Sequence, residues 1–243
     1  MRAPLSALAL AASLLAACAP DAPPADAPRT ADPSTVDADG FDAAAWLAAA
    51  DTLGFDPETT EFDSDETVRA KALADTLDAL VGWRRSCDTA VDPDTGETVY
   101  EPLDPDAGDW SRGTLSVGRV SPREAVVAVT CQFGAYQGSY ALVYFRGDDA
   151  VSLRAPALDE AGQPGAVAER TFATPDWAGL DRRTFTTFAK ARGIGDCGRL
   201  ATYALTGSDT LAVREVRQRE CGDAPPDEID PTAWPVVYPD PGP

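Results

Sequence analysis

The residues with the most chemical potential lie between Lys190 and Gly198, in the segment Lys-Ala-Arg-Gly-Ile-Gly-Asp-Cys-Gly, with Cys221 further along the chain. A cysteine beside an arginine could act as a nucleophile, because a nearby positive charge lowers a thiol pKa. The N–H groups of Gly193 and Gly195 could form an anion-binding nest. No lysine followed by serine or threonine comes after these glycines, so the segment is not a P-loop. We favour a tight corner in which glycines supply positive φ and a disulfide fixes the chain.

Two charged residues of this segment allow a structural or a functional interpretation. Arg192 and Asp196 could form an ion pair that fixes the corner, or they could line a ligand site. The chain contains no histidine, which excludes Ser-His-Asp and Cys-His activation of a nucleophile, a histidine base and a histidine metal site. Acidic residues are numerous, but no spacing singles out a carboxylate pair for glycoside chemistry. No catalytic residue is therefore assigned, and Asp196 is the carboxylate to test if the protein is a hydrolase.

The beginning of the chain has the pattern of an export signal. Residues 1–18 combine an early arginine, a short apolar run and the ending Leu-Ala-Ala-Cys, which resembles the lipobox of bacterial lipoproteins. That resemblance implies cleavage before Cys18, lipid on its thiol and, because Ala19 rather than aspartate follows, an outer-membrane location facing the periplasm. Residues 19–40 are rich in Pro, Ala and Asp, and we expect them to be a disordered tether. An ordinary signal peptide is the alternative.

Five cysteines are consistent with an exported protein. If Cys18 carries lipid, then Cys87, Cys131, Cys197 and Cys221 remain, and an even number in an oxidising compartment favours two disulfides. A zinc site is the weaker alternative, because no Cys-x-x-Cys spacing exists.

Helical and strand patterns divide the rest of the chain into two parts. Residues 41–83 hold two amphipathic helices, at 41–53 and 67–81, the second ending at Gly82. Residues 84–243 are β-rich. The fold class is therefore α+β, mainly antiparallel β as a sandwich or curved sheet, with two N-terminal helices and disulfide staples. Strands are predicted at the following ranges: 98–103, 113–120, 124–133, 139–146, 150–154, 167–172, 184–189, 199–205 and 211–217.

Several features of this β-rich part can be predicted in more detail. Residues 140–145 are apolar at both parities, which indicates a central strand buried on both faces. Residues 155–166 read as a Pro/Gly-rich loop, and the strands at 167–172 and 184–189 are expected to pair across a turn near 181–183. The terminal Trp-Pro-Val-Val-Tyr-Pro is restricted by its prolines to an edge or a surface strap.

One hairpin suggests how the cysteines pair. The turn Thr-Gly-Ser-Asp at 206–209 joins two strand patterns, and the midpoint between Cys197 and Cys221 falls at position 209, inside this turn. These two cysteines should therefore meet at the open end of the hairpin, where closing the loop contributes about 3 kcal/mol. Pairing of Cys87 with Cys131 follows by elimination, and it would tie the segment after the second helix to the sheet.

The charge of the chain limits its partners. Its formal net charge is −20. Nucleic acid is therefore not expected as a partner, because binding it needs a positive footprint. A cationic envelope protein, for instance a hydrolase that is inhibited, is compatible with the acidity. The turns at 92–97 and 104–109 are rich in aspartate and hint at calcium, but neither has EF-hand spacing. We expect ordinary turns and no cofactor.

Three motifs resemble a bacterial exported family known as domain of unknown function 1176. They are Arg-Gly-Ile-Gly-Asp-Cys-Gly at 192–198 with the later Cys221, Val-Thr-Cys-Gln-Phe-Gly-Ala-Tyr-Gln-Gly-Ser-Tyr at 129–140, and the terminal Trp-Pro-Val-Val-Tyr-Pro at 234–239. The resemblance covers roughly residues 85–240. It implies a cell-envelope domain and transfers no catalytic residue. We therefore expect a lipid-anchored, non-catalytic envelope module that binds another envelope component. The alternatives are a carboxylate-based envelope hydrolase and a calcium-dependent adhesion module.

Overall fold

The structure is a computed structural model that describes residues 40–53, 65–91, 98–100, 112–133, 137–222 and 229–239. Its helices are α1 (Ala43–Asp51), α2 (Asp65–Val81) and α3 (Trp83–Cys87), followed by the 3-10 turns η3 (Leu180–Arg182) and η4 (Pro231–Ala233). The strands of the first half are β1 (Thr89–Val91), β2 (Thr98–Tyr100), β3 (Leu115–Ser121), β4 (Glu124–Phe133), β5 (Gly138–Arg146), β6 (Asp149–Ser152) and β7 (Ala155–Leu158). Those of the second half are β8 (Pro164–Glu169), β9 (Thr171–Phe172), β10 (Thr174–Asp176), β11 (Thr184–Lys190), β12 (Gly198–Leu205), β13 (Leu211–Arg219) and β14 (Val236–Tyr238).

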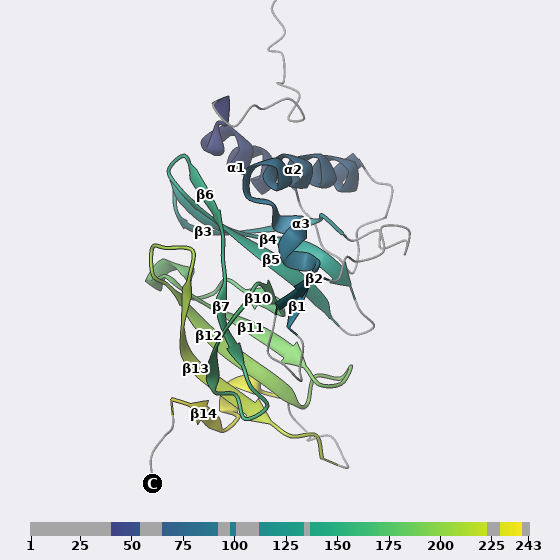
Figure 1. Cartoon of the computed structure of the whole chain (residues 1–243), viewed down its shortest axis with the longest axis vertical. Coiled ribbons are helices and arrows are strands. Elements are labelled where there is room, and N and C mark those ends of the chain that lie inside the picture. The colour runs from purple at the N-terminus through teal and green to yellow at the C-terminus, as the bar shows by residue number, and fades with distance from the viewer. Residues whose placement is uncertain are drawn as a thin grey trace, which may run out of the picture. The chain divides into compact units, whose positions relative to one another are not determined.

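These strands form two main antiparallel sheets. The first has the order β3-β4-β5-β6, with β9 also paired to β5, and the second has the order β10-β11-β12-β13-β14. Two ribbons, β1-β2 and β7-β8, complete the pairing. The helices lie against one side of the first sheet and the second sheet lies on its other side (Figure 1). The α+β, mainly antiparallel prediction is confirmed.

The middle layer is apolar on both faces, as predicted for residues 140–145. Side chains alternate along a strand, so β4 and β5 each supply both cores. The helix-facing core takes Ala125, Val127, Val129, Cys131, Ala141, Val143 and Phe145. The core between the sheets takes Val126, Ala128, Tyr140, Leu142 and Tyr144. Cys131 therefore points inward with Val127 and Val129.

Two tryptophans join the helices to this layer. Trp46 of α1 stacks on Phe145 with ring centroids 5.3 Å apart, and its indole N–H donates to the Leu73 carbonyl at 3.2 Å. Trp83 is fully buried and donates to the Ala74 carbonyl at 2.7 Å. Buried tryptophans need such acceptors, so these bonds fix how α1 and α2 pack. None of the helices in the described ranges has the length and apolar character to cross a membrane.

The first correction concerns the chain after α2. The β-rich part was expected to begin at residue 84, but residues 83–87 form the short helix α3. Gly82 ends α2 as predicted, with φ of +63°, and the turn redirects the chain so that Trp83 and Cys87 share one buried face. Arg84 anchors α3 to α2 by donating to Asp78 at 3.0 Å.

The second correction concerns residues 155–172. The predicted loop at 155–166 contains β7, the turn and the start of β8, because a two-stranded ribbon tolerates prolines at positions that need no N–H donor. Its turn is closed by Asp159, whose carboxylate accepts from the Gln163 N–H at 2.8 Å. The predicted pairing of 167–172 with 184–189 is wrong. β8 pairs with β7, β9 pairs with β5, and β11 takes β10 as its partner on that side.

The last hairpin and the tail match their predictions. Strands β12 and β13 flank the turn at 206–209, with Leu205 opposite Leu211. A bulge near Thr202 shifts the register by one residue. β14 pairs with β13 at the edge of the second sheet, in the segment that its prolines restrict to such a position.

A glycine in β3 allows Trp177 and Leu180 to pack closely against this strand. A Cβ on Gly118 would lie 2.6 Å from Cδ2 of Trp177 and closer still to Leu180. Trp177 cannot withdraw freely, because its indole donates to the Ser116 hydroxyl at 3.0 Å. We expect Gly118→Ala to lower the free energy of unfolding by about 1–3 kcal/mol through overpacking. Urea unfolding checks this, with Gly165→Ala as the control, since its Cβ would make only ordinary contact at 3.4 Å. Equal losses in both variants would contradict the explanation.

Candidate functional site

The predicted corner joins β11 to β12 and is closed by its own backbone. Lys190 lies opposite Gly198, and Ala191 donates to the Cys197 carbonyl at 3.1 Å. Gly195 has φ of +70°, a conformation that disfavours other residues. Gly198 has φ of +137°, and a Cβ there would collide with the Ala189 carbonyl. Both glycines are thus required by the shape of the turn.

Arg192 and Asp196 face each other rather than a cleft. Nε of Arg192 donates to Oδ1 of Asp196 at 2.6 Å, and a second N–H pairs with Oδ2. The third nitrogen of Arg192 donates to the Gly222 carbonyl at 3.2 Å, which ties the corner to the end of the hairpin. The Asp196 side chain is only 2% exposed. Hydrogen bonding from Arg192 holds the pKa of Asp196 below its usual range, and the same bonds raise the pKa of Arg192.

Both disulfides join the predicted pairs, one expected from the hairpin and the other by elimination. Cys197 is bonded to Cys221 with Cα atoms 5.0 Å apart, and Cys87 is bonded to Cys131 with Cα atoms 5.3 Å apart. The second bond ties α3 to β4, as expected. Neither Cys197 nor Cys221 is a free thiol, so neither is a nucleophile here. Of the predicted corner residues, Gly193 is exposed.

A second cluster of charged residues, missed in the sequence, locks the two sheets together. The Tyr144 hydroxyl and the Arg183 guanidinium both donate to the Glu124 carboxylate, and Arg183 also donates to the Tyr144 oxygen at 2.9 Å. Burial alone would raise the pKa of Glu124, but these two donors outweigh it and hold the pKa lower. Arg183 adopts φ of +61°, which is unusual for a residue with a side chain. Because its groups satisfy one another, we interpret this cluster as a structural lock.

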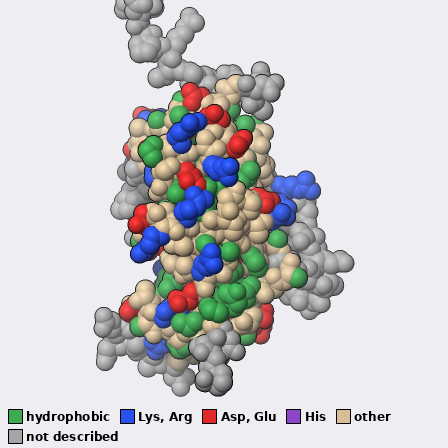
Figure 2. Space-filling model, turned by 90° about the vertical axis from the view of Figure 1, so that its left-hand side faces the viewer, with side chains coloured by type: hydrophobic (Ala, Val, Ile, Leu, Met, Phe, Trp, Pro, Cys, Tyr) green, Lys and Arg blue, Asp and Glu red, His purple; other side chains and the backbone are tan. Residues whose placement is uncertain are grey.

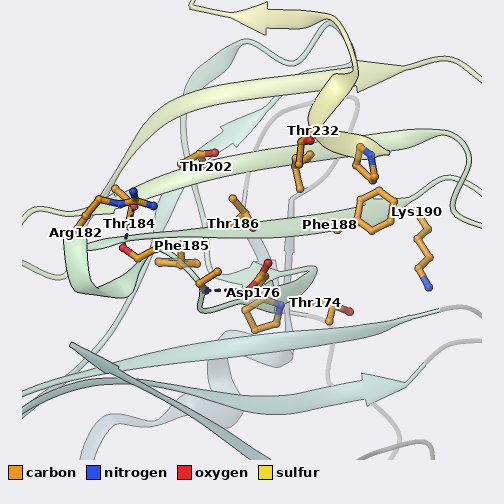
Figure 3. Close-up of a pocket in the computed structure, with 15 residues that line it drawn as sticks. Thr174, Asp176, Arg182, Thr184, Phe185, Thr186, Phe188, Lys190, Thr202 and Thr232 are labelled. Atoms are coloured by element: carbon orange, nitrogen blue, oxygen red, sulfur yellow. Dashed lines mark hydrogen bonds between the residues drawn. The ribbon is translucent and has the colours of Figure 1, made fainter. Parts of the chain in front are cut away.

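The outer face of β11 borders an open groove of about 620 Å³ (Figure 3). Strand alternation places Thr184, Thr186, Phe188 and Lys190 on this face. Further hydroxyls come from neighbouring segments, at Thr174, Thr202 and Thr232. The sequence carries only a weak signal of this groove, namely threonines at alternate positions of one strand.

Aromatic and cationic side chains lie at defined places along this groove. Phe188 packs against Trp234 with ring centroids 5.6 Å apart, so the chain after η4 buttresses the Phe188 end. Arg182 lies at one end and Lys190 at the other (Figure 3). From residue 184 to residue 190 an extended strand covers about 20 Å, at roughly 3.4 Å per residue. The groove therefore suits an elongated ligand.

The expected calcium turns, at 92–97 and 104–109, lie outside the described residues, as does Cys18. Within the described ranges, no group of three or more Cys, Asp or Glu side chains is arranged to hold a metal ion. The calcium alternative therefore stays a prediction from the sequence.

The described fold is nearly neutral, although the chain is strongly acidic. Its described residues include 20 of the 40 acidic side chains and 18 of the 20 basic ones, a formal net charge of −2. Basic and acidic side chains intermingle on the face shown in Figure 2. The excess of acid therefore belongs to sequence segments outside the described residues, and a uniformly acidic surface is not a property of the fold.

Together these features define a disulfide-linked, antiparallel β protein with a helical cover on one sheet and an open groove on the other. The chain belongs to the family described as protein of unknown function (DUF1176), whose profile matches residues 89–239. The match confirms the resemblance seen in the sequence and begins after α3. No curated protein and no solved structure matches the chain significantly.

The Arg192–Asp196 pair yields a test of the structural interpretation. We expect Asp196→Asn to lower the urea midpoint at pH 7, because it removes the charged partner of Arg192. An acid whose folded pKa is lowered stabilises the fold above its unfolded pKa, about 3.9, and loses this effect as pH falls through the folded value. The difference from wild type should therefore be constant between pH 7 and about pH 4 and shrink below that.

Asp181→Asn is the matched control for this experiment. Asp181 and Arg182 are both exposed and lie 3.9 Å apart, so that substitution should leave the midpoint unchanged. An Asp196→Asn variant as stable as wild type at pH 7 would instead support the catalytic interpretation of this carboxylate.

Proposed function

We propose that this protein is a lipid-anchored, non-catalytic binding module of the bacterial cell envelope, in which the groove on the outer face of β11 binds the ligand. The observation that carries the proposal is the groove itself, an elongated hollow of about 620 Å³ lined by hydroxyls and bounded by cations. The lipobox ending at Cys18 and the two disulfides support an exported, membrane-tethered location. By resemblance to lipoprotein sorting rules, Ala19 after the cysteine favours an outer-membrane position facing the periplasm.

The lining of the groove favours an anionic glycan chain as the ligand. Threonine hydroxyls both donate and accept hydrogen bonds, which suits the hydroxyl and amide groups of sugars. Phe188 and Leu200 offer apolar surface to the faces of sugar rings. Neither cation is neutralised by a close partner. Arg182 has only its exposed contact to Asp181, and no ion pair to Lys190 exists among the described residues. Acidic groups on a glycan would provide the missing partners.

The alternatives receive less support from this groove. Among the described residues that line it, Asp176 is the one acid, and its carboxylate accepts from the Ala178 N–H at 2.9 Å. Glycoside hydrolysis needs two carboxylates that flank the bond, so a hydrolase would have to use other residues. A cationic protein partner is disfavoured here, because Arg182 and Lys190 would repel it.

Binding to peptidoglycan fragments tests the groove. Arg182→Glu combined with Lys190→Glu should weaken binding of soluble, carboxylate-bearing peptidoglycan fragments at least tenfold, because both cationic ends are reversed. Wild-type binding should also weaken as salt concentration rises. Microscale thermophoresis measures both effects, and neutral chitin oligosaccharides serve as the uncharged ligand.

A matched double reversal, Arg69→Glu with Arg170→Glu, controls for the change in net charge. Both residues are exposed and neither lines the groove. If this control loses as much affinity as the groove variant, or if wild type binds neither ligand, the groove is not the glycan site.

The lipid anchor has its own test. Cys18→Ala should abolish incorporation of radiolabelled palmitate and move the protein from the membrane fraction to the soluble periplasmic fraction, because the acylated thiol is lost. Cys221→Ala is the control, since that cysteine is in a disulfide and should not affect labelling. Equal labelling of the Cys18→Ala variant would contradict lipidation at this residue.

A further inference from the structure

A second, smaller cavity lies behind the groove, on the inner side of the same two strands. It has a volume of about 130 Å³ and is bordered by the inner faces of β11 and β12 and by β8. Thr187 follows Thr186 along β11, so successive residues of this strand line two separate hollows on opposite faces. The cavity is therefore distinct from the proposed glycan groove and needs its own explanation.

The walls of this cavity are unusually polar for the space between two sheets. Thr187 and Tyr203 are 5% and 3% exposed, and burial raises the pKa of Tyr203 while the neighbouring Thr187 hydroxyl partly opposes this effect. Phe172 meets Tyr203 edge to face, with ring centroids 5.7 Å apart, and completes an aromatic side. Besides these uncharged side chains, the lining of the cavity includes one acidic group.

That group is the carboxyl of Glu169, at the end of β8. Glu169 pairs with the fully buried Ala155 across the β7-β8 ribbon, so its side chain points toward the inter-sheet core. Among the described residues, none donates a hydrogen bond to this carboxyl and none forms an ion pair with it. Burial raises the pKa of Glu169, and the charge of Arg199 only partly opposes this effect. Glu169 is half-buried, and a carboxylate that is partly withdrawn from water and lacks protein donors is well placed to accept hydrogen bonds from a ligand.

Arg199 supplies the opposite charge in the same cavity. Its Nε donates to Oε1 of Gln218 at 3.1 Å, and its Nη2 donates to the carbonyls of Asp159 and Glu160 at 2.6 and 3.4 Å. Nη1 donates to the Leu158 carbonyl at 3.3 Å. Since a guanidinium has five N–H donors, one remains on Nη1, and no described carboxylate neutralises the charge within ion-pair distance.

We propose that this cavity binds a small zwitterionic amino acid, whose ammonium group is held by Glu169 and whose carboxylate is held by Arg199. The ammonium group of the ligand would pair with the Glu169 carboxylate, and its carboxylate would pair with the Arg199 guanidinium. Because the ligand is zwitterionic, its binding adds no net charge to the cavity. Singly charged molecules would leave either Glu169 or Arg199 without a partner.

The size of the cavity sets the size of the ligand. Its volume of about 130 Å³ corresponds to roughly four water molecules at about 30 Å³ each. This space accepts glycine, alanine or serine, whereas an aromatic amino acid would exceed it. The cavity thus selects by charge at its two ends and by volume between them.

Alanine is the probe for this proposal, with propionate and ethylamine as ligands of similar size that lack one charged group each. We expect racemic alanine to raise the melting temperature of the intact protein and to give saturation-transfer NMR signals. Propionate and ethylamine should bind at least tenfold more weakly, because each leaves one charged wall unpaired. Phenylalanine should not bind.

Glu169→Gln is the decisive variant, and Glu160→Gln on the exposed turn of the same ribbon is its control. Glu169→Gln should weaken alanine binding at least tenfold and should still fold, because it removes a half-buried charge that no described residue pairs with, whereas Glu160→Gln should bind alanine as wild type does. Ethylamine binding as tightly as alanine would indicate a simple cation site and overturn the proposal. So would equal binding by wild type and Glu169→Gln, or no binding of alanine at tens of millimolar.

Discussion

The rest of the structure depends on the burial of β4 and β5 on both faces. A sheet with one apolar face needs one covering layer, but strands that carry valine, leucine, tyrosine and phenylalanine at both parities need two. Helices α1–α3 cover one face and the second sheet covers the other. This arrangement explains why the helical segment shares a core with the β-rich part. It also leaves the second sheet with an outer face that no further layer of the described chain covers.

The features predicted correctly are those that local patterns determine. Double-sided burial of residues 140–145 follows from their composition, and the last hairpin follows from its turn at 206–209. The pairing of Cys197 with Cys221 follows from that hairpin, and the one-residue bulge does not spoil it because a disulfide tolerates a range of Cα separations. Where a strand and its partner are neighbours in sequence, local reasoning is sufficient.

The errors occurred where the partner of a strand is distant or the segment is short. β9 has only two residues and pairs with β5, some thirty positions earlier, so no local signal could assign it. The groove and the inner cavity were missed for a related reason. Their residues are spread over β7 to β12 and η4, and they become neighbours only when the second sheet forms. The Arg-Gly-Ile-Gly-Asp-Cys-Gly segment is more conspicuous in the sequence. Its ion pair, its glycine conformations and its disulfide explain why it has this composition.

The turn between β11 and β12 is nevertheless physically related to the groove and to the inner cavity. The Arg192–Asp196 pair and the Cys197–Cys221 bond fix the end of β11 relative to β12, and thereby the spacing of side chains on both faces of these strands. On the outer face this spacing sets the row from Thr184 to Lys190, and on the inner face it sets Thr187 beside Tyr203. A binding site on a sheet loses less conformational entropy when its strands are already held in register. The segment that looked most reactive in the sequence thus contributes to binding by positioning residues that the sequence did not reveal.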